Sequence, residues 1–104
     1  MTNPLPRPVS AYFEAATPTG IADCFTEDAI VIDERRTRRG RSEILKWREE
    51  VGKIDFRQEI LSSERNGSQV RVTCNVTGTF PGSPVELGYV FELSGDRISR
   101  LEIS

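Results

Sequence analysis

Apolar and polar residues alternate along most of the second half of the chain, which predicts β-strands with one buried face. Glycine, asparagine and proline stand between the alternating segments, as is typical of short turns. Together these signals predict a meander of four antiparallel strands. Its other face carries threonine and charges of both signs, a surface that is either solvated or paired with a second copy of the chain. The strands are expected at residues 54–60, 70–77, 85–93 and 98–103, with turns at 66–67, 81–84 and 94–96.

The first half of the chain has the spacing of short amphipathic helices. Apolar residues three or four positions apart predict helices over residues 9–16, 20–25 and 42–51. A short apolar run at residues 29–33 predicts one strand between the second and third helices. The order of elements is therefore that of an α+β protein whose helices cover one face of the sheet.

The length of 104 residues corresponds to one domain, residues 1–104, with no room for a second core. No apolar run approaches the length that spans a bilayer, and the N-terminus lacks the apolar segment of a signal peptide. A cytoplasmic protein is therefore expected. The formal charge of −2 gives no general attraction to nucleic acid or to an anionic membrane surface.

The chain contains no histidine, and this absence restricts its chemistry more than any other count. It excludes triads of serine or cysteine with histidine, and metal sites built on imidazole. Acid–base catalysis would have to use carboxylates, tyrosine, lysine or cysteine. Cys24 and Cys74 fall within apolar patterns and are expected to be buried free thiols. Because Glu27, Asp28, Asp33 and Glu34 lack metal-ligand spacing, no metal is expected. No other cofactor is expected either.

Five arginines fall within residues 35–41. They could bind phosphate, carboxylate or nucleic acid, or they could form the solvated edge of a β-hairpin. Nucleic acid is disfavoured, because no aromatic residues for base stacking are interleaved and because Asp33 and Glu34 offset part of the charge. A place at the mouth of a pocket, where the arginines would steer an anionic ligand, agrees with both the absence of stacking aromatics and the partly offset charge.

Three stretches of sequence resemble the signature of a known superfamily. They are CFTEDAIVID at residues 24–33, Gly40 followed by EILKW, and the C-terminal GYVFELSGDRISRLEIS. In this order they resemble the SnoaL-like and ketosteroid-isomerase-like branch of the NTF2-like superfamily, over about residues 10–104. The resemblance implies three N-terminal helices packed in a strongly curved antiparallel sheet, which form a cone with an apolar pocket. It also implies a homodimer through the outer face of the sheet.

The resemblance also supplies candidate catalytic residues. Asp33 matches the general-base aspartate of the isomerases, a carboxylate at the rim of an apolar pocket that removes a proton beside a carbonyl group. Tyr12 is similar in position to a phenol that donates to the developing enolate oxygen, with a shorter link after the first helix than is usual in the family. The protonated aspartate that the isomerases add is absent, and Tyr89 stands near its place.

The residues themselves leave these roles open. A period of two puts Asp33 on the same face as Ala29 and Val31, but Ile30 and Ile32 would serve equally well as core residues. Tyr12 could equally be a core aromatic. The side chains expected to line the pocket are those of Trp47, Phe56, Val31 and Phe91.

Two hypotheses of different classes follow. The first is an isomerase, cyclase or dehydratase that acts without a cofactor on a hydrophobic carbonyl compound, with Asp33 as base. The second is a non-catalytic dimeric module that binds a small apolar molecule or a partner protein. An Asp33 carboxylate that faces a pocket favours the first hypothesis, and an ion pair with Arg36 or Arg38 favours the second.

Overall fold

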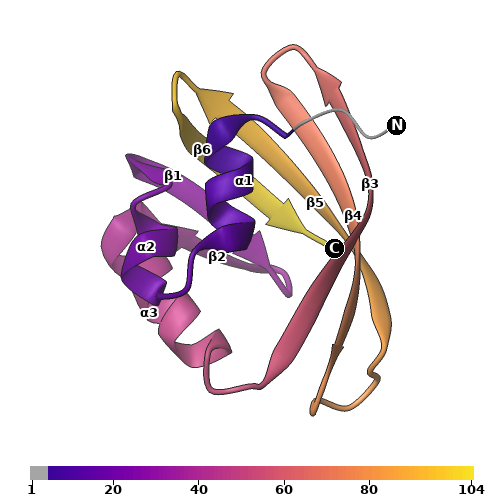
Figure 1. Ribbon diagram of the computed structural model, residues 1–104. Coiled ribbons are helices and arrows are strands. Elements are labelled where there is room, and N and C mark those ends of the chain that lie inside the picture. Colours follow the sequence, from indigo (N-terminus) through magenta and orange to yellow (C-terminus); the bar gives the residue numbers. More distant parts are fainter. Residues whose placement is uncertain (1–4) are drawn as a thin grey trace.

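The computed structural model describes residues 5–104 and contains three helices and one six-stranded sheet (Figure 1). The sheet is bent, with α1 in front of its concave side, α3 beside β1 and β2, and α2 packed on α3. Within residues 5–104 no helix is long and apolar enough to cross a membrane. In chain order the elements are α1 (Arg7–Glu14), α2 (Pro18–Ala22), β1 (Phe25–Asp33), β2 (Arg36–Arg39), α3 (Gly40–Val51), β3 (Phe56–Asn66), β4 (Gln69–Gly78), β5 (Val85–Ser94) and β6 (Arg97–Ile103).

The strands are arranged in the order β2-β1-β6-β5-β4-β3, so the sheet is mixed. Strands β3 to β6 form the predicted antiparallel meander. The prediction of a wholly antiparallel sheet is wrong at one pairing, because β1 lies parallel to β6, with Val31 opposite Leu101. A long connection through α3 and four strands, β2 to β5, separates the two and permits parallel pairing. Residue alternation is the same for either direction and therefore could not reveal it.

The first half of the chain differs from the prediction at its boundaries. α2 ends at Ala22, because Phe25 already pairs with Ile98 as the first residue of β1. α3 begins at Gly40 and follows the β1–β2 hairpin, so only α1 and α2 precede the whole sheet. The arginines at residues 36–39 form β2, the edge strand of that hairpin.

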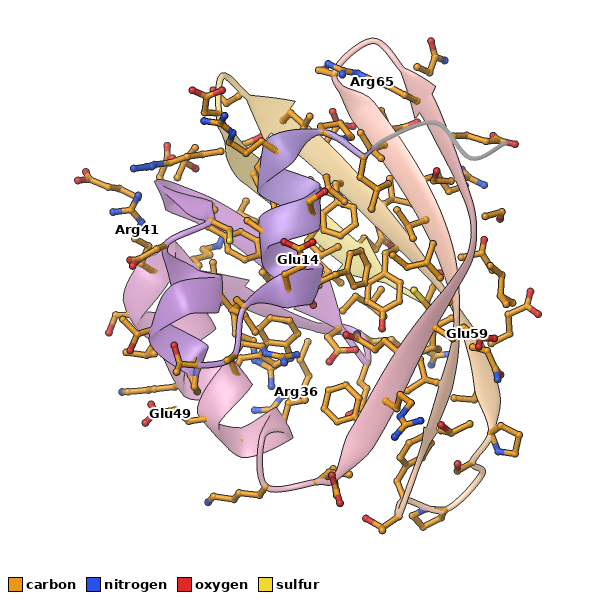
Figure 2. All side chains as sticks on the ribbon, viewed as in Figure 1. Glu14, Arg36, Arg41, Glu49, Glu59 and Arg65 are labelled. Atoms are coloured by element: carbon orange, nitrogen blue, oxygen red, sulfur yellow. The ribbon has the colours of Figure 1, made fainter. Side chains whose placement is uncertain are left out.

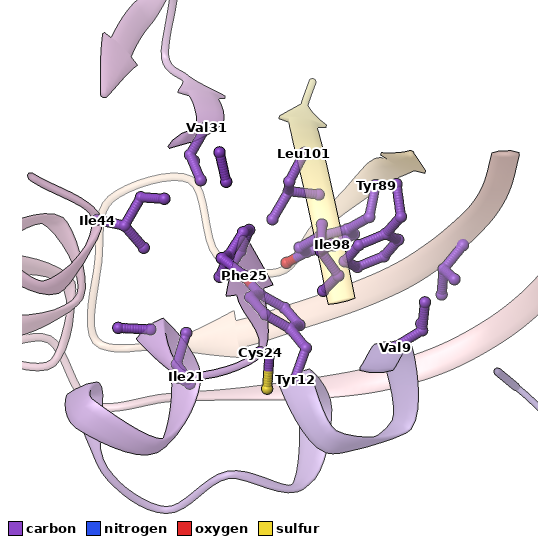
Figure 3. Close-up of a cluster of buried hydrophobic side chains, with 14 of the residues drawn as sticks. Val9, Tyr12, Ile21, Cys24, Phe25, Val31, Ile44, Tyr89, Ile98 and Leu101 are labelled. Carbon is purple, nitrogen blue, oxygen red and sulfur yellow. The ribbon is translucent and has the colours of Figure 1, made fainter. Parts of the chain in front are cut away.

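The core lies between the concave face of the sheet and the helices. Figure 3 shows Val9 and Tyr12 of α1 together with Ile98 and Tyr89 of the sheet in one apolar cluster. The alternation in β4 is confirmed, since its inward residues are all buried. They are Val70, Val72, Cys74 and Val76.

A bulge explains why two residues of β6 that lie three positions apart are both buried. Leu93 pairs with Ile98 and Glu92 pairs with Arg100, so Ser99 is the extra residue of β6. Its hydroxyl donates to the Glu92 carbonyl oxygen at 3.2 Å. The extra residue restores Leu101 to the inner face.

The convex face of the sheet and its β3 edge are polar over most of their extent. Glu59 of β3 pairs with the outward residue Asn75 and lies on the side away from the helices, as Figure 2 shows. Ile54 and Ile60, expected on the buried face, are instead 44% and 37% exposed. Ile54 precedes β3, and Ile60 adjoins a register shift in this edge strand. Pairing of two copies through the outer face stays a prediction.

Candidate functional site

A cavity of about 670 Å³ lies between the sheet and helices α1 and α3, in the size range that holds a drug-sized ligand. Most of its wall is apolar, with side chains from β3 to β6 and from the loops beside them. The apolar lining includes Trp47, Val51, Phe56, Val76, Phe80 and Leu87. The polar lining consists of Tyr12, Asp33, Glu34, Arg48, Gln58, Tyr89 and Ser104.

Asp33 is the last residue of β1, and its partly buried side chain lines the cavity. It lies on the face that also carries buried Ala29 and Val31, as the period of two predicts. The Trp47 indole N–H donates to Asp33 Oδ2 at 2.9 Å. Within residues 5–104 Asp33 forms no ion pair, so the outward pairing with Arg36 or Arg38 is not found.

The turn after Asp33 has an unusual backbone. Glu34 and Arg35 have positive φ angles, 53° and 65°, which side-chain-bearing residues adopt rarely. Such a two-residue turn reverses the chain tightly between β1 and β2, with Asp33 paired to Arg36. The turn thereby places Glu34 at the cavity and fixes the strand end that carries Asp33.

Tyr12 and Tyr89 approach the cavity from opposite sides, one from α1 and one from β5. Their ring centroids are 6.5 Å apart. The Tyr12 hydroxyl is buried and has no hydrogen-bond partner among the described residues. The Tyr89 hydroxyl accepts a hydrogen bond of 2.8 Å from Gln58 Nε2, so its own proton remains available for donation.

Both phenols are held in the neutral form. Burial raises the pKa of Tyr12 far above its ordinary value of 10.0, although the charge of Arg48 lowers it in part. Burial likewise raises the pKa of Tyr89 to about 12, against the lowering effect of the Gln58 hydrogen bond. The negative charge of Asp33 adds a smaller upward contribution to each pKa. At neutral pH both groups are hydrogen-bond donors.

An alkaline titration tests this arrangement. Tyr12 and Tyr89 are the only tyrosines, so the tyrosinate absorbance reports on them alone. At pH 10, where an exposed phenol is half ionised, we expect almost no tyrosinate in the folded protein. Above pH 10 the unfolded chain loses protons that the folded chain keeps, so the free energy of unfolding falls as the pH rises toward 12. Half-ionisation at pH 10 in a folded sample would contradict the burial of these hydroxyls.

The residues expected to line the pocket divide into two pairs. Trp47 and Phe56 lie on the cavity wall. Val31 and Phe91 do not, since both are fully buried in the core beneath it. A strand pattern identifies the inward face, but the cavity occupies only the end of that face.

Arg48 and Gln58 are functional candidates that the sequence analysis missed. Arg48 follows Ile44 by four positions, which places it beside the apolar stripe of α3. Gln58 occupies an inward position in the alternation of β3. The available signal was a polar residue at a position where the helix or strand period predicts a buried apolar one.

The thiols and the basic edge take no part in the cavity. Cys24 and Cys74 are free and buried, as predicted, and burial raises the pKa of both. In the edge strand Arg38 contacts the Asp33 carbonyl oxygen at 3.4 Å, while Arg41 of α3 donates to the Phe25 carbonyl oxygen at 2.9 Å. Among residues 5–104 no cluster of three or more acidic or cysteine side chains could hold a metal ion.

Solved structures share this architecture. A candidate polyketide cyclase from Sinorhizobium meliloti is 38% identical, with a TM-score of 0.91 over 96% of this chain and 95% of its own. A protein of ketosteroid isomerase-like fold from Catenulispora acidiphila, solved with trimethylamine, is 20% identical, with a TM-score of 0.85 over 97% and 86% of the two chains. A candidate ketosteroid isomerase from Kribbella flavida is 16% identical, with a TM-score of 0.79 over 94% and 74%. The last two likenesses concern the fold alone.

The fold and the cavity define an α+β protein of the NTF2-like class, whose bent sheet and helices enclose a pocket. The family model of the SnoaL-like domain matches residues 9–101, and the chain belongs to that family. The resemblance stated from the sequence is thereby confirmed. No curated protein matches the chain.

Proposed function

We propose that the protein is a cofactor-free acid–base enzyme of the isomerase or cyclase type, acting on a hydrophobic carbonyl compound. The observation that carries the proposal is the presence of one carboxylate and two neutral phenols on the wall of a largely apolar cavity. The likeness to the candidate polyketide cyclase supports the same reaction class. A fold alone would not, because one fold hosts many functions.

In this proposal Asp33 takes a proton from the carbon beside the carbonyl group. The C–H electron pair forms a C=C bond, and the carbonyl π pair moves to oxygen, which becomes an enolate. Tyr12 or Tyr89 donates a hydrogen bond to that oxygen where the negative charge develops. In an isomerisation the enolate is conjugated with a neighbouring C=C bond, and Asp33 returns the proton to the far carbon of that system while the carbonyl group re-forms. In a cyclisation the enolate carbon bonds to the carbon of a second carbonyl group, whose π pair moves to its oxygen and takes the proton from Asp33. Neither step needs an oxidant or a reductant.

A binding module without catalysis is the second candidate function. The observation in its favour is that the Trp47 indole already occupies one oxygen of Asp33. In a binding module the carboxylate would serve only to orient Trp47, and the cavity would hold an apolar ligand unchanged.

Proton exchange distinguishes the two candidates without knowledge of the natural substrate. We expect the protein to accelerate deuterium incorporation beside the carbonyl of a bicyclic ketone such as 2-tetralone in D₂O, measured by proton NMR. A binding module would bind the ketone and shift its resonances. The deuterium exchange of the ketone would then stay at the rate measured in buffer alone. Binding without exchange across a panel of such ketones would overturn the enzymatic proposal.

The two phenols are tested by removal of their hydroxyl groups. We expect whichever of Tyr89→Phe and Tyr12→Phe removes the donor to the enolate oxygen to slow exchange by roughly a hundred- to a thousandfold. Tyr89→Phe also leaves Gln58 without its partner, so thermal unfolding should accompany the rate measurement. Exchange at the rate of the unaltered protein in both variants would exclude the phenols as donors.

A further inference from the structure

Arg48 of α3 places a cation on the wall of the cavity, enclosed by aromatic rings. Its guanidinium carbon lies 6.0 Å from the ring centroid of Tyr12, 5.3 Å from that of Trp47 and 5.7 Å from that of Phe56. Attraction between a cation and these ring faces holds the group in position. The faces do not satisfy its N–H donors, which lie in the guanidinium plane.

The charge of Arg48 has no partner in the described part of the protein. Its Nε is shielded from solvent and makes no hydrogen bond there. Asp33 and Glu34 are the other charged side chains on the cavity wall, but the ion pair found within residues 5–104 is Arg100 with Glu102. Arg48 is partly buried, and a shielded N–H of a cation without an anion or acceptor is unfavourable, so this position suits an incoming negative group.

The Tyr12 hydroxyl is a second unpartnered polar group on the same wall. It is buried, its ring faces the Arg48 guanidinium, and the positive charge of Arg48 acts on it directly. Buried polar atoms nearly always have a hydrogen-bond partner, and two without one stand together here. The two oxygens of one carboxylate could accept from them.

We propose that Arg48 and Tyr12 form a subsite for a negatively charged oxygen, and that the cavity takes a hydrophobic acid, an apolar body that carries a carboxylate. Tyr89 then remains as the donor to the reacting carbonyl group. The proposal deepens the proposed function and rests on its ligand-binding half, not on Asp33 acting as a base.

The test compares an acid with its uncharged analogue of the same shape. Calorimetry with 3-cyclohexylpropanoate and 3-cyclohexylpropanamide should show the acid binding at least about tenfold more tightly to the unaltered protein, because hydrogen bonds to an ionised group are the stronger ones. Arg48→Met, which keeps an unbranched apolar side chain and removes the charge, should abolish this preference. Arg57→Met, which removes an exposed arginine of β3 outside the cavity, should leave it unchanged.

Further variants keep the outcome decisive. If circular dichroism shows that Arg48→Met is unfolded, Arg48→Lys and Tyr12→Phe replace it, and the acid preference should persist in part in the first and fall in the second. Asp33→Asn should bind the acid more tightly, because it removes a like charge from the cavity wall. Equal binding of acid and amide to the unaltered protein would overturn the subsite, whether or not ketone exchange is observed. Acid preference without exchange would overturn the base and leave the subsite standing.

Discussion

Asp33→Asn should abolish ketone exchange, with a loss of about a thousandfold, the usual contribution of a positioned general base. The amide cannot accept a proton from carbon at neutral pH. Its oxygen can still accept the Trp47 indole N–H that Asp33 Oδ2 accepts at 2.9 Å. The replacement therefore removes the base while keeping the hydrogen bond that orients it. The measurement is the deuterium incorporation rate under saturating ketone.

The matched control is Asp28→Asn on the same strand. Asp28 is exposed and accepts a hydrogen bond of 3.1 Å from the Thr26 hydroxyl, away from the cavity. We expect its exchange rate to equal that of the unaltered protein. Thermal unfolding of both variants separates loss of chemistry from loss of structure. Substantial exchange in a folded Asp33→Asn protein would sink the assignment of Asp33 as base.

Phe91→Ala should produce the largest loss of stability, about 3–5 kcal/mol in the free energy of unfolding. Phe91 is 0% exposed, and its ring centroid lies 5.4 Å from that of Tyr12 and 6.3 Å from that of Tyr89. Truncation leaves a void in the core and removes the support of both phenols. Small domains have only about 5–15 kcal/mol in total, so the midpoint of urea unfolding should fall steeply.

Phe80→Ala serves as the comparison, because Phe80 is a phenylalanine on the cavity wall and is only partly buried. Less of its surface leaves water on folding, and we expect a loss of about 1 kcal/mol. Because Phe80 lines the cavity, we expect its loss to weaken ligand binding more than it lowers the stability of the fold. Equal losses in the two variants would show that Phe91 contributes to the cavity wall and not to the core.

The local sequence determined most of the secondary structure. The alternation over residues 70–93 has a period of two, and that period alone fixes which residues of β4 and β5 share a face. Gly67 and Gly95 have φ angles of 64° and 60°, at the turns that their sequence neighbours predicted. Asp33 shares a face with Val31 for the same reason of period. These features depend on near neighbours in the chain, which the sequence displays directly.

The site depended on contacts between residues far apart in the chain. Trp47 donates to Asp33 across 14 positions, and Gln58 donates to Tyr89 across 31. The parallel pairing of β1 with β6 joins the β1–β2 hairpin to the meander of β3 to β6, and no local pattern records it.

The sequence by itself determined the class of fold, the inward faces of the strands and the restriction of any chemistry to residues other than histidine. Only the tertiary structure decided that Phe56 borders a cavity while Phe91 fills the core, and that Arg48 turns toward the same space as Tyr12. The physical reason is that periodicity specifies direction from the backbone, whereas depth and open volume depend on how the bent sheet and the helices pack together.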